Sequence, residues 1–147
     1  LNRKKLGEIV FHDKVKLRRL NEIVFPYIIR AIQAAIDGLR AEGQELIVLD
    51  APTLFESGCD RFCDAVVSVV AREELRLERI ISRDGLTREE AEARIRAQHK
   101  ESWYVRRSDF VLENNGSEEE LRLALSEVLV RIRQGERPRL ERAEEPR

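Results

Sequence analysis

Three short, largely apolar runs limit what this chain can fold into more than any other feature of it. They cover residues 46–49, 66–70 and 110–112, and each is followed by a polar loop and a segment expected to be helical. Runs of this length are typical of strands buried on both faces of a parallel sheet. Strands that alternate with helices therefore predict an α/β fold built on a parallel sheet.

Helical spacing dominates the residues before the first run. Pro26 falls between two sets of apolar residues, so it is expected to end one helix and begin the next. Gly43 is expected to end the second helix in the left-handed conformation. The two sets are Leu17, Leu20 and Val24, and then Ile29, Ile32, Ile36 and Leu39.

Two capping boxes mark helix starts in the second half of the chain. Residues 87–90 read Thr-Arg-Glu-Glu and residues 117–120 read Ser-Glu-Glu-Glu. In such a box the hydroxyl and the Glu carboxylate satisfy free backbone amides reciprocally. A helix is also predicted over 72–83, ending at an Asp-Gly turn, and the charged residues 136–147 are expected to form a loose tail.

Composition excludes several classes of function. The 27 basic and 28 acidic residues nearly cancel, so no overall field attracts nucleic acid or an anionic membrane. No apolar run approaches the roughly 20 residues of a membrane helix. Cys59 and Cys63 have no further ligands at metal-binding spacing, which favours reduced cytosolic thiols over a zinc site. The chain has no Met and opens inside a predicted helix, so we expect that its beginning is missing.

The loop over residues 50–58 is a first candidate site. Ligands of parallel sheets bind beyond the carboxyl ends of the strands, and this loop follows the first predicted strand. Leu54 and Phe55 could form a substrate wall, with Glu56 accepting hydrogen bonds from a ligand. The alternative is a loop whose apolar residues close the core and whose Glu is solvated.

A row of arginines is the second candidate. Their spacings of four, three and four place them on one face of a helix. Guanidinium groups bind phosphate oxygens bidentately and stay charged, so the row suits a triphosphate. The alternative is a solvated face. The row consists of Arg72, Arg76, Arg79 and Arg83.

The third candidate is the loop Asn114-Asn115-Gly116-Ser117, which could present polar groups to a base. A turn followed by an N-cap explains the same residues fully, and by themselves they favour that interpretation. The phosphate-binding motif G-x-x-x-x-G-K-[ST] is absent from the 147 residues. Patterns for a Ser/His/Asp triad or a metalloprotease are absent as well.

Five stretches in a fixed order resemble the dephospho-coenzyme A kinase family, over nearly the whole chain from residue 3 to about 133. Their order and spacing are more specific than any single stretch. They are residues 3–11, residues 17–21 with Pro26, and residues 49–58, 79–87 and 109–117.

The resemblance implies a P-loop kinase fold, here incomplete at the N-terminus. It implies a helical coenzyme A-side region over 1–45, a helical lid over 72–107 and a charged tail over 136–147. The α/β nucleotide-binding core would comprise 46–71 and 108–135. The implied activity is transfer of the γ-phosphoryl of ATP, with Mg²⁺, to the 3′-hydroxyl of dephospho-coenzyme A. That reaction is the last step of coenzyme A biosynthesis, and the implied location is the cytoplasm.

The resemblance also assigns roles to individual residues. Arg79 and Arg83 become catalytic lid residues facing phosphates, and Asn114, Asn115, Gly116 and Ser117 become the loop beside adenine. No residue is assigned to a metal or as general base. The substrate side would comprise Asn21, Pro26, Pro52, Leu54, Phe55 and Glu56.

Several positions depart from the family pattern. Phe25 replaces a His before the Pro, Thr53 replaces an apolar residue, and Glu113 replaces an Asp. Residues 99–107, with Trp103 and Tyr104, depart most and are expected to reshape the lid.

The phosphate loop and the acidic residue expected to act as base are missing from these 147 residues. Fixing reactants in place is worth roughly 7–11 kcal/mol, so we expect the 147 residues alone to be inactive. Two alternatives stay open: a different P-loop kinase for a nucleoside or other small alcohol, and a non-catalytic fragment acting as a binding module.

Overall fold

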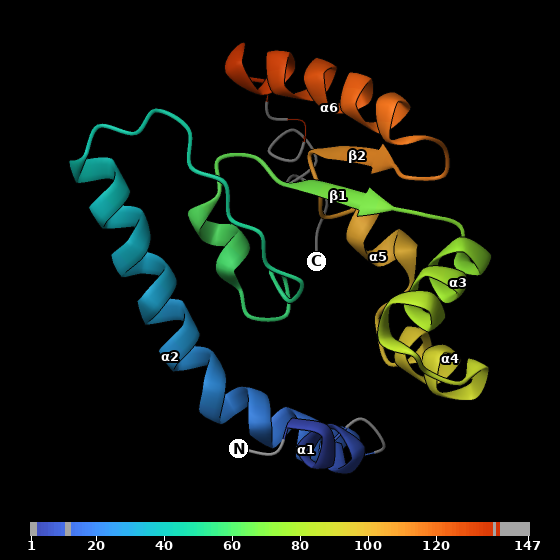
Figure 1. Cartoon of the computed structure of the whole chain (residues 1–147). Helices are drawn as coiled ribbons and strands as arrows, with labels where there is room; N and C mark the ends of the chain where they lie inside the picture. Colours follow the sequence, from blue (N-terminus) through green and yellow to red (C-terminus); the bar gives the residue numbers. More distant parts are fainter. Residues whose placement is uncertain (1–2, 11–12, 137, 139–147) are drawn as a thin grey trace. The chain divides into compact units, whose positions relative to one another are not determined.

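The computed structural model describes residues 3–10, 13–136 and 138. The chain divides into two compact units, Leu1–Cys63 and Asp64–Arg147. Figure 1 labels the helices and strands of both.

The first unit is built on two packed helices, α1 (Arg3–Val10) and α2 (Lys14–Ala41). Asp13 caps α2, because its Oδ1 accepts hydrogen bonds from two of the first free amides of the helix. Gly43 ends it with φ +79°, and the Gln44 N–H reaches back to the Leu39 carbonyl at 3.1 Å. This is the predicted left-handed stop.

The prediction that Pro26 separates two helices is wrong. Helix α2 runs through Pro26 and is 28 residues long. Phe25 and Ile29 are both half-buried and four residues apart, so the apolar stripe of the helix crosses the proline without interruption. An interior proline costs about 3 kcal/mol, and one continuous packing face can offset that cost.

The predicted strand over 46–49 is also wrong. The structure assigns no strand to these residues, and Leu46 and Val48 are 47% and 79% exposed. A strand is stable only where its amides and carbonyls pair with a neighbour, and no described residue pairs with this run. The chain continues through turns to the short 3₁₀ helix η1 (Cys59–Phe62), in which Cys59 is fully buried.

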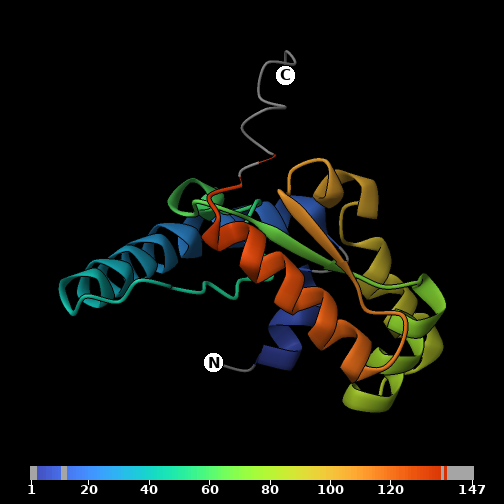
Figure 2. The same cartoon turned by 90° about the horizontal axis from the view of Figure 1, so that it is seen from above.

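The second unit contains a parallel pair of strands, β1 (Val67–Val70) and β2 (Phe110–Glu113). These confirm the other two predicted strands and their parallel pairing. The register sets Val67 opposite Phe110 and Val70 opposite Glu113. Helix α6 (Glu118–Arg133) covers one face of the pair, and α5 (Glu101–Val105) lies on the other (Figures 1 and 2).

The core of this unit lies between the strands and α6. Phe110 and Leu112 alternate with exposed positions along β2, as expected for a strand with one covered face. They pack against Val128 of α6, which is 8% exposed.

Buried polar groups fix where the two strands begin. Asp109 accepts a hydrogen bond at Oδ2 from the Val66 N–H and donates its own N–H to the Val66 carbonyl, both at 2.8 Å. Ser108 Oγ lies 2.6 Å from Ser68 Oγ on the neighbouring strand. Because buried polar groups must be satisfied, these contacts oppose any shift in register.

Three predicted capping signals mark helix ends in the second unit. Helix α3 (Glu73–Asp84) ends at Gly85 with φ +64°, and α4 (Arg88–Arg96) begins with the predicted box at Thr87. The second box starts α6 at Ser117. Helices α3 and α4 pack together (Figure 1). The predicted tail lies outside the described residues except for residues 136 and 138. No helix in the described part of the chain is long and apolar enough to cross a membrane.

Candidate functional site

The carboxyl ends of the two strands form one edge from which two loops leave. Val70 and Glu113 are aligned in the parallel register, so residues 71–72 and 114–117 follow the strands side by side. The Asn114 N–H donates to the Val70 carbonyl at 2.7 Å, which continues the pairing one residue past β2. This edge is where a parallel α/β sheet binds its ligands.

Asn115 ties the two loops together. Its Oδ1 accepts the Arg72 N–H at 2.8 Å, at the N-cap of α3, and its Nδ2 donates to Glu113 Oε2 at 3.2 Å. Both ends of the side-chain amide are thus used within the protein. Asn115 fixes the shape of the loop.

Arg79 joins helix α3 to the same loop. Its Nη1 donates to the Asn114 carbonyl at 2.9 Å, across 35 residues of sequence. The structure therefore brings together one residue predicted to face phosphates and one predicted to lie beside adenine. Arg79 is exposed, and its other guanidinium donors make no hydrogen bond to the described residues, so they can bind an anion at this edge.

Arg83 has a different partner. Its Nε and Nη2 donate to the two carboxylate oxygens of Asp84 at 2.7 and 3.1 Å, and Arg94 Nη1 reaches the same carboxylate at 2.6 Å. The hydrogen bond and charge of Arg83, and then the charge of Arg94, lower the pKa of Asp84. The two arginines predicted to face phosphates are thus engaged with different groups in the structure.

Gly116 and Ser117 form the start of α6. Ser117 Oγ accepts the Glu120 N–H at 3.2 Å, and Glu120 Oε2 accepts the Ser117 N–H at 2.7 Å. These hydrogen bonds to Ser117 lower the pKa of Glu120. A Cβ at Gly116 would collide with the Glu120 carboxylate, so a side chain there would displace that carboxylate from its place in the box. The turn and N-cap interpretation of this loop is confirmed.

The predicted substrate residues lie in the first unit. Asn21 is half-buried on α2, where Pro26 is exposed. Leu54, Phe55 and Glu56 are half-buried within one series of turns that also contains the exposed Pro52. In these turns the Ser57 hydroxyl donates to the Leu54 carbonyl at 3.1 Å.

Among the described residues, no group of three or more His, Cys, Asp or Glu side chains could hold a metal ion.

Several polar contacts around α3 and α4 were not singled out by the sequence patterns. Arg76 Nη2 donates to Gln98 Oε1 at 2.9 Å, and Asp84 accepts from Arg94 on the next helix. No local pattern predicts contacts across 22 or 10 residues. They depend on how α3 and α4 pack.

The segment over 99–107 contains an aromatic stack. The rings of His99 and Trp103 are stacked with centroids 3.9 Å apart, and the Arg107 guanidinium lies 4.1 Å from the Trp103 ring centroid. Of these three residues only Trp103 lies in helix α5, so no helical periodicity in the sequence predicted the stack. Tyr104 meets Trp103 edge-on at 5.0 Å.

Comparison with known proteins gives a consistent result. The sequence model of a family described as dephospho-CoA kinase matches residues 1–120. The dephospho-CoA kinase of Lactobacillus johnsonii is 39% identical over 132 residues, covering 90% of this chain and 67% of the relative. That of Geobacillus kaustophilus is 40% identical over 129 residues, covering 88% and 64%. The chain thus spans about two thirds of the length of these two relatives, 67% of the first and 64% of the second.

Two solved structures are similar to the chain. TT1252 from Thermus thermophilus has a TM-score of 0.72 at 37% identity, covering 90% of this chain and 68% of that one. A dephospho-CoA kinase from Campylobacter jejuni has a TM-score of 0.58 at 32% identity, covering 92% and 67%.

The parallel strands, the loops at their carboxyl ends and the flanking helices define an α/β protein of the P-loop kinase type. Within that class, the chain belongs to the dephospho-CoA kinase family.

Proposed function

We propose that the protein phosphorylates the 3′-hydroxyl of dephospho-coenzyme A at the expense of ATP. The observation that carries the proposal is the family match over residues 1–120, which includes both strand-end loops. A cytoplasmic location is part of the proposal, because the reaction consumes ATP.

The strand-end edge supports a nucleotide site. Asn114 and Asn115 would lie beside the adenine, and the guanidinium of Arg79 would face the phosphates from α3. The hydrogen bond from Arg79 to the Asn114 carbonyl supports this arrangement, because it orients the guanidinium at the edge while leaving other donors available. Arg83, one helical turn further along α3, would face the phosphates as part of the lid over 72–107.

Such arginines act by electrostatic stabilisation. Charge develops on the oxygens of the phosphoryl group as it moves, and a preorganised guanidinium stabilises it. The substrate side is proposed to involve Asn21, Pro26 and the turns containing Pro52, Leu54, Phe55 and Glu56. The half-buried apolar side chains there suit the non-polar parts of a coenzyme A precursor.

The proposal has a direct test. Protein expressed from its complete reading frame is assayed for ADP release with dephospho-coenzyme A, and with adenosine as a competing acceptor. Turnover on dephospho-coenzyme A and none on adenosine is expected. Equal turnover on adenosine would indicate a nucleoside kinase instead, and no turnover on either acceptor would contradict the proposal.

A polypeptide of only these 147 residues is proposed to be inactive. It contains no G-x-x-x-x-G-K-[ST] motif to hold the ATP phosphates. The same ADP-release assay on that polypeptide, with its mass verified, checks this expectation. Turnover by it would show that the motif is dispensable.

A further inference from the structure

Asn115 is followed by Gly116, whereas the other asparagines of the chain are followed by Arg, Glu or Asn. Glycine has no Cβ, so it leaves the backbone nitrogen next to the asparagine side chain unshielded. Gly116 is exposed, and its N–H makes no hydrogen bond to a described residue. A side-chain amide and a backbone nitrogen open to solvent therefore adjoin in the loop over residues 114–117.

Two contacts activate the Asn115 amide. Its Oδ1 accepts the N–H of Arg72 at 2.8 Å, at the N-cap of α3, where the helix dipole is positive. A donor in this place stabilises the negative charge that develops on Oδ1 when a nucleophile attacks Cγ. At the other end of the amide, Nδ2 donates to Glu113 Oε2 at 3.2 Å, and a carboxylate acceptor makes that nitrogen easier to protonate.

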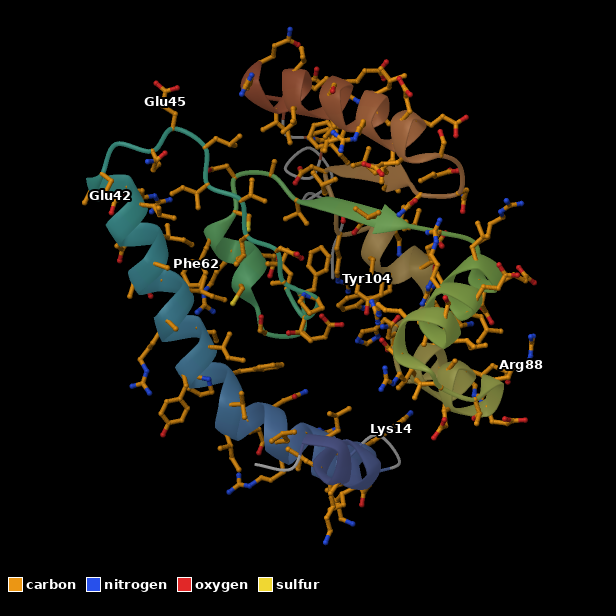
Figure 3. The ribbon with its side chains drawn as sticks, viewed as in Figure 1. Lys14, Glu42, Glu45, Phe62, Arg88 and Tyr104 are labelled. Carbon is orange, nitrogen blue, oxygen red and sulfur yellow. The ribbon has the colours of Figure 1, made fainter. Side chains whose placement is uncertain are left out.

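The fold brings these groups to one place. Both strands run toward the start of α3, and the loop after β2 turns back into α6 at that same end (Figure 3). The polarising N–H of Arg72 and the amide of Asn115 are 43 residues apart in sequence. An asparagine followed by glycine is a local feature, but its activation here depends on the parallel pairing of the strands.

We propose that Asn115 is a site of spontaneous deamidation, at which water converts the side-chain amide to a carboxylate. The Gly116 nitrogen gives its proton to water and attacks Cγ, so that an N–Cγ bond forms and the carbonyl electrons move onto Oδ1. When those electrons return, the Cγ–Nδ2 bond breaks. Nδ2 takes a proton from water and leaves as ammonia, and the product is a succinimide.

Water then opens the succinimide in one of two ways. Breaking the bond between Cγ and the Gly116 nitrogen gives aspartate. Breaking the bond between that nitrogen and the backbone carbonyl carbon of residue 115 gives isoaspartate, whose main chain runs through the former side chain. In either case the net reaction consumes one water and releases one ammonia.

The conversion separates α3 from the loop. Either product sets a second carboxylate beside Glu113, where the amide donor was, and the two negative charges repel each other. Isoaspartate also lengthens the main chain, which moves the acceptor away from the Arg72 N–H. An effect of this change on ATP binding rests on the proposed function, because that function sets adenine beside this loop.

The experiment follows the asparagines of the full chain by peptide mapping and mass spectrometry during incubation at mildly alkaline pH. Asn115 should gain the mass of an amide-to-acid change, while Asn114, in the same loop but followed by Asn, should not. A synthetic peptide of residues 109–121 sets the incubation time. A folded chain unconverted after the peptide has reacted, or equal conversion at both asparagines, would overturn the inference.

A pair of variants tests the activating contact. Glu113→Gln should slow the conversion about fivefold, because it weakens the hydrogen bond to Nδ2 by roughly the value of one such bond. Glu119→Gln removes the same charge from the exposed first turn of α6 and should change the rate less than about twofold. Equal rates for the two variants would refute the role of Glu113.

A second measurement tests the consequence in protein that carries no mutation. Converted and unconverted chains differ in charge and are separated by ion exchange. Hydrogen exchange of the Arg72 amide should be faster in the converted chain, while that of the middle of α6 should not change. Unchanged exchange at Arg72 would show that α3 is not released.

Neither measurement uses ATP or an acceptor alcohol. A failure of dephospho-coenzyme A turnover would therefore leave the deamidation result standing, and the reverse also holds.

Discussion

The Nη1 of Arg79 donates a hydrogen bond to the backbone carbonyl of Asn114 at 2.9 Å, joining helix α3 to the loop after β2. Asn115 adds a second connection through the Arg72 N–H. Helix α3 and the strand-end loop are therefore coupled through two hydrogen bonds.

Arg79→Met should loosen the strand-end loop. It removes a charge-assisted hydrogen bond to a backbone carbonyl, with an expected loss of about 1 kcal/mol at this exposed site. Hydrogen exchange of the amides over 114–117 should accelerate, while that of the middle of α6 should not. Arg76→Met, whose partner is Gln98, is the control from the same helix face and should leave the loop unchanged. Unchanged exchange in the Arg79 variant would contradict the coupling.

Asn115→Ala should destabilise the protein by about 1 kcal/mol, because it removes the acceptor for Arg72 and the donor to Glu113. Urea denaturation measures the change. Asn115→Asp keeps the acceptor but sets a second carboxylate beside Glu113, so its destabilisation should shrink as the pH is lowered. An Asp variant as stable as the parent at neutral pH would show that the contact with Glu113 contributes nothing.

Gly116→Ala should open the capping box of α6. The new Cβ would displace the Glu120 carboxylate from the Ser117 N–H. The loss of stability should resemble that of Ser117→Ala, about 1 kcal/mol for a lost N-cap. Combining Gly116→Ala with Glu120→Ala should cost less than the sum of the two single changes, which a double-mutant cycle of denaturation midpoints measures. If the stability losses of the two single changes were fully additive, the new Cβ would not be clashing with the Glu120 side chain.

The Asp84 carboxylate should make stability depend on acid. Hydrogen bonding and charge from Arg83, and then the charge of Arg94, hold its pKa in the folded state below the ordinary value of 3.8. Its contribution is therefore present above about pH 4 and is lost as the pH falls through the lower, folded-state pKa. Denaturation of the parent and of Asp84→Asn between pH 6 and pH 2.5 should show a smaller acid-induced loss in the variant. Parallel pH profiles would contradict this assignment.

The core between the strands and α6 can be tested within β2. Leu112→Ala should cost about 3 kcal/mol, because Leu112 is 5% exposed and packs in the cluster with Phe110 and Val128. Val111 is the next residue, on the other face and 38% exposed, so Val111→Ala should cost much less. Thermal denaturation of both variants makes the comparison. Similar losses of stability in the two variants would mean that α6 does not cover the face of β2 that carries Leu112.

Local signals were sufficient for much of the fold. Thr87 and Ser117 start helices, and Gly43 and Gly85 end them, because a cap depends only on residues within one turn. The same local reasoning failed at Pro26, where packing of a continuous apolar face outweighed the lost hydrogen bond. It failed again over 46–49, because a strand depends on a partner that its own residues cannot supply.

The candidate site divides in the same way. The sequence by itself determined which residue types gather at the strand ends: arginines on α3, and Asn114 and Asn115 after β2. Only the tertiary structure decided their partners. Arg79 meets the Asn114 carbonyl across 35 residues, and Arg94 meets Asp84 across two helices. A guanidinium on a long, flexible side chain can reach many acceptors, so its partner is set by how the helices and strands pack rather than by its place in the chain.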